Sequence, residues 1–373
     1  MKVDKKNLVR SANQNETNQE TFVSHHNSKI THYNTESQVF YSEKQEFQSK
    51  FIPKKQKSQL LANSFFRIGE KKRSLRVRDC GSFLAFAHEI DSDGVIAEKG
   101  KLHNANFCRE RLCPMCIWRR TMKIYGQISK IMEHMPKDTN YLFLTLTIPN
   151  CSGDDFQETI DKLFKSFGKL IRNKDFKNAI IGYYRVLEVT RNKKNGTYHP
   201  HFHVILAVLP SYFQGKYYIK HEKWLDMWRN AYGDESITQV DIRKIKARDK
   251  SLSESVDLRD LDGFKSIEGA VSETAKYAVK DNDFILEKDT ETMDKVVSTL
   301  LHGLKNRRLV QFGGIFKDVA SRLKLDDAED GDLIHLDEDK INGAVAHMIV
   351  KYGWRAGEYQ IINSEIKRIG DDE

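Results

Sequence analysis

The chain has 373 residues, of which 31% are charged, and a formal net charge of +8. This length supplies one large domain or two ordinary ones. The positive charge fits a polyanion such as nucleic acid, although an ordinary basic protein would also show it. No run of eighteen apolar residues and no signal-peptide core occur, so we expect neither a membrane span nor export. Five cysteines, an odd number, then indicate a reducing cytoplasm and metal binding rather than disulfides.

The first segment, residues 1–64, is rich in Asn, Gln, Ser, Thr, Glu and Lys and has few aliphatic residues. Such a segment buries too little apolar surface to offset the entropy lost on ordering. We therefore expect it to be disordered. His25 and His26 in it are interpreted as solvated loop residues rather than ligands.

A cysteine-rich block follows in residues 65–135. Cys113 and Cys116 are separated by two residues, a spacing at which neighbouring thiolates chelate one zinc ion. Cys108 lies within reach upstream, and Cys80 is the natural fourth ligand, with His103 as its substitute. A redox-active pair is the alternative for a C-x-x-C spacing, but no thioredoxin-like context surrounds it. The predicted structural zinc ligands are Cys80, Cys108, Cys113 and Cys116.

A basic helix is predicted directly after this block, over residues 117–134. Arg119, Arg120 and Lys123 on it are candidate contacts for DNA phosphates. The alternative is an ordinary solvated helix face.

Alternating apolar residues predict strands at 141–148 and 180–190, with an amphipathic helix between them over 154–173. A basic turn over 191–196 joins the second of these strands to the next apolar run. Asn195-Gly196 permits the positive φ angles of a tight turn, so we expect a β-hairpin.

The next strand, residues 198–208, organises the candidate site. Side chains alternate along a strand, so His201 and His203 point to one face and Phe202 to the other, which we take as the core face. Two imidazoles side by side can hold one divalent metal ion.

Glu188 is an acid in otherwise apolar sequence and would lie near the two histidines across the hairpin. A carboxylate with two imidazoles suits Mg²⁺ or Mn²⁺ at a phosphoryl site and also suits zinc, and the spacing does not choose between them. His199 shares the face of His201 and His203, so His199 with His201 is the alternative pair. We prefer the later pair because the apolar strand continues after it.

Residues 267–280 are interpreted as a helix. Glu273 and Tyr277 are four residues apart and share one face, with Lys280 on the same side and Lys276 adjacent. A nearby cation lowers the cost of forming a phenolate and binds phosphate. Tyr277 is therefore a candidate nucleophile, and a packing tyrosine is the alternative.

Other elements expected nearby are a short helix, a basic-edged strand and a charged loop, at residues 223–232, 240–246 and 248–266.

The C-terminal part, residues 321–373, begins with an acidic stretch that we interpret as a solvated linker. Tyr352, Trp354 and Tyr359 follow it, and this last part is expected to close a small sheet.

Three elements resemble, in order, the motifs of plasmid rolling-circle replication initiators. These initiators belong to the HUH endonucleases, named for His-hydrophobe-His. The motifs are Phe143-Leu144-Thr145-Leu146-Thr147, His199-Pro200-His201-Phe202-His203 and Glu273-Thr274-Ala275-Lys276-Tyr277-Ala278-Val279-Lys280. The cysteine block over 108–116 and Glu188-Val189-Thr190 are similar to the same group. The resemblance covers residues 78–316.

The resemblance implies a mechanism. Tyr277 would attack the scissile phosphate, leaving a 3′-hydroxyl that primes synthesis and a 5′-phosphotyrosine bond. Glu273 stands where some relatives carry a second tyrosine and would act as a general base for water in the closing step. Lys280 would steady phosphate or phenolate charge, and Lys276 is a candidate DNA contact. The implied ligands of Mg²⁺ or Mn²⁺ are His201, His203 and Glu188.

The resemblance also implies a ferredoxin-like or RNA-recognition-motif-like catalytic domain. The expected fold is α+β, a central antiparallel sheet with flanking helices plus a small zinc-binding module. Implied partners are single-stranded or hairpin DNA at a plasmid origin, a host helicase, single-strand-binding protein and DNA polymerase, all in the cytoplasm. The alternatives are an HUH transposase or relaxase, and a zinc-containing DNA-binding regulator without nuclease activity. The expected parts are a disordered segment, a zinc module with the basic helix, a catalytic domain and a C-terminal segment, at residues 1–64, 65–135, 136–320 and 321–373.

Overall fold

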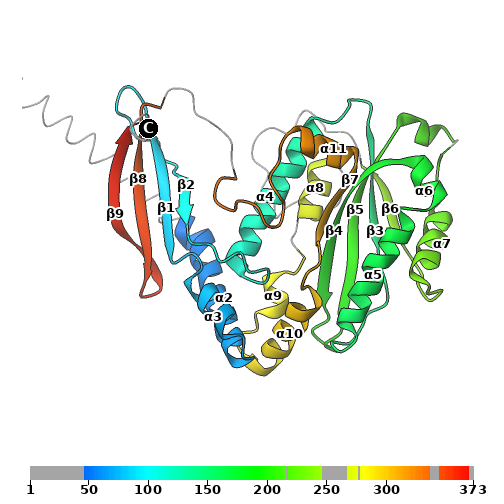
Figure 1. Ribbon diagram of the computed structural model, residues 1–373, viewed down its shortest axis with the longest axis horizontal. Helices are drawn as coiled ribbons and strands as arrows, with labels where there is room; N and C mark the ends of the chain where they lie inside the picture. Colours follow the sequence, from blue (N-terminus) through cyan, green and yellow to red (C-terminus); the bar gives the residue numbers. More distant parts are fainter. Residues whose placement is uncertain (1–45, 216, 246–266, 276–277, 337–343, 369–373) are drawn as a thin grey trace, which may run out of the picture.

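A computed structural model of the chain describes residues 46–215, 217–245, 267–275, 278–336 and 344–368. Two antiparallel sheets stand side by side, with helices between and around them (Figure 1). The predicted α+β class is confirmed, with antiparallel sheets, flanking helices and a cysteine cluster that could form a small metal-binding module. Within these described ranges, no helix is both long enough and apolar enough to cross a membrane.

The larger sheet has the strand order β6-β3-β5-β4-β7. β5 is its central strand, because it pairs antiparallel with β3 on one side and with β4 on the other. All of its residues except His199 are buried, as expected for a strand covered on both faces. The strands are β3 (Asn140–Leu146), β4 (Ile180–Arg191), β5 (Tyr198–Val208), β6 (Asp241–Ile245) and β7 (Val310–Gly314).

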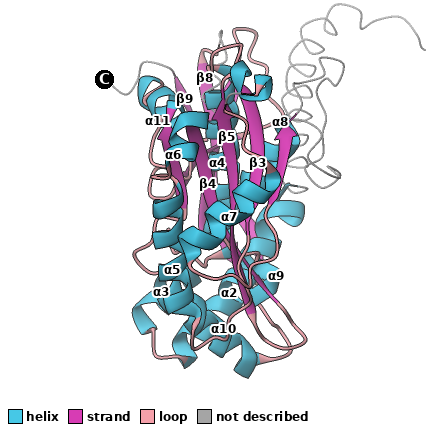
Figure 2. Cartoon of the chain, turned by 90° about the vertical axis from the view of Figure 1, so that its right-hand side faces the viewer, coloured by secondary structure: helices cyan, strands magenta, loops and turns pink. Residues whose placement is uncertain are grey.

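Helices cover both faces of this sheet (Figure 2). On one face, Phe164 and Phe167 place their rings 5.2 and 5.4 Å from the ring of Phe202 on β5, centroid to centroid. His201 and His203 alternate with Phe202, so they point to the opposite face. The first face carries α5 (Phe156–Leu170), α6 (Lys174–Ala179) and α7 (His221–Tyr232); the second carries α4 (Pro114–Glu133), α8 (Ile267–Ala275) and α11 (Ile315–Arg322).

The smaller sheet has the order β2-β1-β8-β9 and is built from segments far apart in the sequence. β1 pairs with β8 along its whole length, from Phe83 opposite Gly353 to Ile90 opposite Ala346. The C-terminal hairpin therefore closes a small sheet, and it does so on the cysteine module. The strands are β1 (Phe83–Ile90), β2 (Lys101–Ala105), β8 (Ala346–Arg355) and β9 (Glu358–Arg368).

The predicted disorder of residues 1–64 needs correction for its described part. Residues 46–64 form the short π-helix η1 (Phe47–Phe51) and most of α2 (Ile52–Arg67). The cause is aromatic rather than aliphatic burial, since the ring of Phe47 lies 4.6 Å from Tyr352 and 4.9 Å from Tyr359. Phe47 and Phe51, two aromatic residues in otherwise polar sequence, therefore anchor the segment against the hairpin formed by the C-terminal strands of the smaller sheet.

The β-hairpin predicted across the turn at 191–196 is confirmed, and the amide of Asn192 donates to the carbonyl of Thr197 across four intervening residues. One local prediction differs from the structure. The helix predicted over 267–280 ends at Ala275 among the described residues, and Lys280 instead precedes a separate short helix. The remaining helices are α3 (Lys71–Asp79), η2 (Pro210–Gln214), α9 (Asp281–Phe284) and α10 (Thr290–Gly303).

Candidate metal centres

The register of the β4–β5 hairpin assembles the first candidate centre. Glu188 stands directly opposite His201, and Val186 stands opposite His203. The three polar side chains therefore share one face and converge. Glu188, His201 and His203 are 4, 7 and 8% exposed, so the cluster is almost completely removed from water.

The three ligand atoms are close enough to share one ion. The Nε2 atoms of His201 and His203 are 3.2 Å apart, and Oε2 of Glu188 lies 3.0 Å from His203 Nε2 and 3.7 Å from His201 Nε2. An ion about 2.1 Å from each ligand places neighbouring ligand atoms about 3.0–3.4 Å apart. The donor set thus fits a divalent metal ion, and the geometry is compatible with Mg²⁺, Mn²⁺ or Zn²⁺.

The other ring nitrogen of each histidine has its own partner. Nδ1 of His201 lies 3.1 Å from the carbonyl oxygen of His199, and Nδ1 of His203 lies 3.2 Å from Oγ1 of Thr145. A carbonyl only accepts, so Nδ1 of His201 is the donor and its Nε2 is left as a ligand. His199 contributes its backbone here, and its side chain stacks on His201 outside the ligand set.

Charge at the cluster favours an ionised carboxylate. Burial by itself raises the pKa of Glu188, but hydrogen bonds with His201 and His203 and the charge of Lys280 bring that pKa well below its usual range. Nζ of Lys280 lies 3.1 Å from Oε1 of Glu188. Lys280 therefore contacts the carboxylate of the cluster, a role the helical reading of 267–280 did not predict.

Described residues on both sides of the predicted nucleophile are fixed to β4. The hydroxyl of Tyr184 donates to the carbonyl of Thr274 at 2.7 Å, and the amide of Val189 donates to the carbonyl of Ala278 at 2.7 Å. Val189 is next to Glu188 in the chain. Tyr277 and Lys276 themselves lie outside the described residues, while Glu273 is half-buried on α8.

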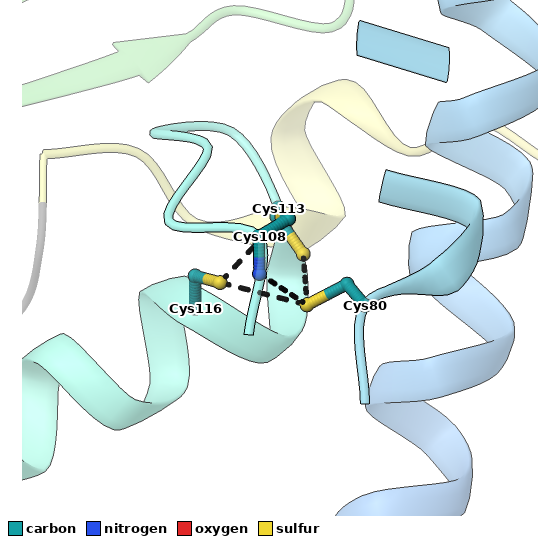
Figure 3. Close-up of side chains that lie close together, drawn as sticks. All are labelled: Cys80, Cys108, Cys113 and Cys116. Atoms are coloured by element: carbon teal, nitrogen blue, oxygen red, sulfur yellow. Dashed lines mark hydrogen bonds between the residues drawn. The ribbon is translucent and has the colours of Figure 1, made fainter. Parts of the chain in front are cut away.

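The second candidate centre is the cysteine cluster (Figure 3). Cys80 follows α3, Cys108 comes from the loop before α4, Cys113 is the N-cap of α4 and Cys116 lies in its first turn. The Sγ–Sγ distances are 3.6 Å from Cys80 to Cys113 and to Cys116, and 3.7 Å from Cys108 to Cys116.

These distances identify the chemistry that the cluster could perform. A disulfide requires about 2.05 Å between sulfurs, whereas four thiolates about 2.3 Å from a tetrahedral zinc ion stand about 3.8 Å apart. The donor set therefore fits a zinc-type ion. His103, the substitute ligand, lies on β2 and is not part of the cluster.

Helix α2 supports the cysteine cluster with two polar side chains that sequence reasoning missed. Oγ of Ser58 lies 3.3 Å from Sγ of Cys113. The ammonium of Lys55 is fully buried and donates to the carbonyls of Arg78 and Cys80, each at 2.8 Å. A buried cation at this position would offset part of the negative charge that four thiolates carry when they hold a metal ion. The only sequence signal for this role was a lysine and a serine three residues apart on one helix face.

A comparison with protein families decides the identity of the chain. The family model described as Replication protein matches residues 99–360, well over half of the sequence. This chain belongs to the replication-protein family. The resemblance to replication initiators inferred from the motifs is thus confirmed at the level of the family.

Several curated replication proteins align with most of this one. Protein rep of Bacillus amyloliquefaciens is 35% identical over 316 residues, which cover 82% of this chain and 91% of the relative. Protein rep of Streptococcus pneumoniae serotype 2 is 37% identical over 285 residues, 75% of this chain and 81% of the relative. Protein rep of Staphylococcus aureus is 38% identical over 243 residues, which cover 64% of this chain and 96% of the relative. No solved structure matches this replication protein.

The predicted DNA contacts on α4 need correction, because the structure engages them inside the protein. Arg119, Arg120 and Lys123 are 6, 1 and 6% exposed. Arg119 donates to the carbonyls of Leu333 and Ile334, while Lys123 pairs with Asp326 at 2.8 Å. The acidic stretch that we predicted to be a solvated linker instead supplies the hydrogen-bond acceptors and the ion-pair partner of these side chains.

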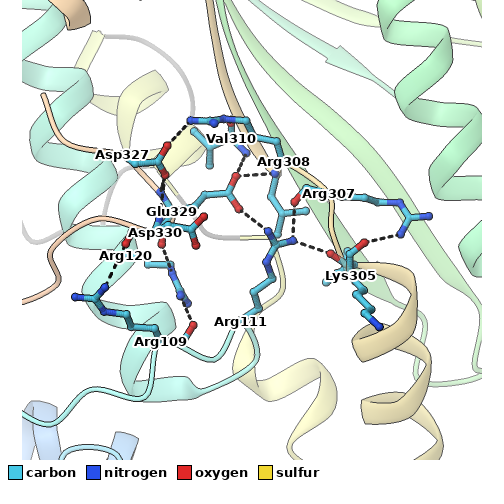
Figure 4. Close-up of polar contacts among 12 residues, drawn as sticks. Arg109, Arg111, Arg120, Lys305, Arg307, Arg308, Val310, Asp327, Glu329 and Asp330 are labelled. Atoms are coloured by element: carbon cyan, nitrogen blue, oxygen red, sulfur yellow. Dashed lines mark hydrogen bonds and ion pairs between the residues drawn. The ribbon is translucent and has the colours of Figure 1, made fainter. Parts of the chain in front are cut away.

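The same stretch connects helix α4 to strand β7 of the larger sheet (Figure 4). Nε of Arg120 donates to the carbonyl of Glu329 at 2.9 Å. The carboxylate of Glu329 accepts the amides of Leu309 and Val310 at the start of β7, at 2.8 and 3.1 Å, and lies 3.5 Å from Arg111. Residues 326–334 are therefore a structural connection between α4 and the larger sheet.

Proposed function

We propose that this replication protein initiates rolling-circle replication of a plasmid by nicking one strand of its origin through a 5′-phosphotyrosine intermediate. The observation that carries the proposal is the buried cluster of Glu188, His201 and His203. Its three ligand atoms converge toward the turn end of the central strands β4 and β5, and residues that flank Tyr277 in the sequence are anchored to β4. Such a donor set suits phosphoryl transfer because a divalent ion held by it would polarise a phosphate for attack by a nucleophile.

In the proposed step the phenol oxygen of Tyr277 attacks the scissile phosphorus in line. The bond from phosphorus to the 3′ oxygen breaks and a phosphotyrosine bond to the 5′ side forms. The phenol loses one proton, and the departing 3′ oxygen takes up one proton to become the 3′-hydroxyl. A divalent ion at the cluster would polarise the phosphoryl oxygens and stabilise the developing negative charge. The ester conserves the energy of the phosphodiester, so the step requires no ATP.

The other residues have supporting roles in this proposal. Lys280 steadies charge at the carboxylate of Glu188 and at the phosphate. Glu273 acts as the general base for water when the second cleavage ends replication by hydrolysis. The four cysteines hold a structural zinc ion that fixes the start of α4 to α2 and α3. The helicase, single-strand-binding protein and polymerase of the host would extend the released 3′ end.

The test uses a supercoiled plasmid and a labelled single-stranded oligonucleotide, each carrying the cognate origin, with Mg²⁺ or Mn²⁺. Products are separated on a denaturing gel with SDS, wild type beside Tyr277→Phe. We expect a metal-dependent nick with a protein-linked 5′ end that the variant loses while it still binds DNA. Tyr183→Phe, which changes a half-buried tyrosine of β4, is the matched control and should retain the nick.

Two other outcomes would redirect the proposal. Cleavage that survives in Tyr277→Phe would remove the nucleophile assignment. Binding without a nick or an adduct, from folded protein with either metal, would support a zinc-containing DNA-binding regulator instead. The family match to replication proteins favours an initiator over an HUH transposase or relaxase.

A further inference from the structure

Helices α2 and α3 form a hairpin that lies before the residues matched by the family model. Three residues, Ile68, Gly69 and Glu70, connect the helices, and Gly69 has a φ of +86° that favours glycine. A short glycine-containing connection between two packed helices is the arrangement of helix-turn-helix elements, which present their second helix to a ligand. The hairpin lies along the lower edge of the molecule in Figure 1, where α2 packs against α10.

Helix α3 is held by a narrow strip and presents the rest of its surface outward. Ser74 and Val77, three residues apart, are its buried residues. Oγ of Ser74 donates to the carbonyl of Ala62 on α2 at 2.7 Å. Lys71, Lys72, Leu75, Arg76, Arg78 and Asp79 are exposed. The helix is thus anchored by its inner strip, and its exposed surface is mostly basic.

The cations of this hairpin divide into paired and unpaired groups. Arg73 and Arg76 both contact the carboxylate of Glu110, at 2.5 and 2.9 Å, so they serve the fold. Among the described residues, Lys71 and Lys72 have no acidic partner. Among the described residues, the guanidinium of Arg78 has a hydrogen bond only with the amide oxygen of Asn63, at 3.2 Å. Charges that are exposed and uncompensated can meet an external polyanion at little desolvation cost.

We propose that α3 is the surface by which this protein docks on duplex DNA beside its nick site, with Lys71, Lys72 and Arg78 contacting backbone phosphates. This inference rests on the proposed function. Duplex is favoured over a single strand because α3 carries no aromatic side chain on which a base could stack. The predicted alternative, the basic face of α4, is occupied by residues 326–334.

A groove continues from this hairpin toward the catalytic sheet. It has a volume of about 970 Å³ and runs from Arg67 and Ile68 at the end of α2 to Arg191 and Gly196 at the β4–β5 turn. That turn leads directly into the strand that carries His201. The groove reaches this β4–β5 hairpin on the face of Tyr198, whose ring lies 5.0 Å from Phe156 of α5, opposite to the face of the metal ligands. DNA docked on α3 can therefore extend along the groove as far as the turn of the β4–β5 hairpin.

The experiment measures binding of the full chain to a fluorescent duplex of the origin by anisotropy, across a series of salt concentrations. Lys71→Ala/Lys72→Ala is compared with wild type and with Lys165→Ala/Lys169→Ala. The control removes two exposed lysines of α5 and therefore makes the same change in net charge. We expect the α3 variant to bind roughly 10- to 100-fold more weakly near 0.1 M salt, with a salt slope smaller by about 1.8, because two phosphate contacts are lost.

The control should change affinity by less than about threefold, and Lys71→Arg/Lys72→Arg should restore binding. Equal weakening in both alanine variants would show attraction by net charge alone and would overturn the assignment. Unchanged duplex binding by the α3 variant, or a loss confined to single-stranded DNA, would overturn it as well. Wild-type nicking of a single-stranded oligonucleotide is measured separately, so a failure of the proposed nuclease is distinguished from a failure of α3 docking.

Discussion

Nδ1 of each histidine points away from the candidate metal position, and its hydrogen bond determines how well the imidazole ring is oriented. His201 is held by a backbone carbonyl, which no side-chain substitution removes. His203 depends on the hydroxyl of Thr145, which stands opposite it in the β3–β5 register. Partners of this kind fix the tautomer and ring orientation of a metal ligand. Thr145 belongs to a motif recognised in the sequence, but its partner became visible only through strand pairing.

We therefore predict that Thr145→Val weakens binding of Mn²⁺ by about 10- to 100-fold with little loss of stability, because valine keeps the shape and removes the hydroxyl. Calorimetric titration of Mn²⁺ measures the effect. Thr147→Val is the matched control, since Oγ1 of Thr147 donates to the carbonyl of Gln239 away from the cluster. Equal weakening in both variants would contradict the role given to Thr145.

Glu273 provides a separate test of the closing reaction. Replacing it with alanine should leave the first nick intact and slow hydrolytic release by about 100-fold or more, the usual contribution of a general base. The protein-linked DNA should then accumulate on a denaturing gel. Ser272→Ala, a neighbouring change on α8, should turn over normally. Normal hydrolysis by Glu273→Ala would refute the general-base role.

Helix α4 shows which parts of an element can be predicted from its own sequence. The two-residue spacing of Cys113 and Cys116 predicts a chelating pair at the start of a helix, and the structure brings the four predicted cysteines together. The basic residues that follow also predict a helix, but not where its charges go. Arg119 and Lys123 are buried by a segment some 200 residues later in the chain. The charges of one sequence segment do not show whether its basic side chains contact DNA phosphates or pair with a distant segment of the folded chain.

The cysteine cluster should behave as a structural unit. Cys116→Ser should abolish stoichiometric zinc, measured by elemental analysis, and lower the thermal unfolding midpoint, because metal binding and folding are coupled in such sites. Cys151→Ser is the control, since Cys151 lies outside the cluster and pairs through its backbone with Tyr198. Full zinc content in Cys116→Ser, or equal destabilisation in the control, would argue against a four-cysteine site.

Across the whole molecule, the central hairpin was predictable and the joining of distant segments was not. The alternation of side chains along the two strands was sufficient to predict that Glu188 lies beside His201 and His203. Both strands adjoin the same turn, so the positions of these residues relative to the turn determine which of them face each other. The pairing of β1 with β8 unites positions about 260 residues apart, and no local pattern encodes it. The anchoring of Phe47 on Tyr359 has the same character. Composition identified the N-terminal and acidic segments as polar but could not reveal the partners that order them.

The acidic connection gives the last prediction. Glu329 accepts the amides of Leu309 and Val310 in a buried position and lies close to Arg111. Glu329→Ala would leave both amides without their carboxylate acceptor, so we expect the free energy of unfolding to fall by roughly 2–4 kcal/mol, measured by chemical denaturation.

Asp330→Ala is the control. Arg109 reaches only the backbone carbonyl of Asp330, so this variant should change stability by less than about 0.5 kcal/mol. If the stretch were a solvated linker, the two variants would be equally stable. A larger loss in Glu329→Ala alone would support a structural role for residues 326–334 in connecting α4 to the larger sheet.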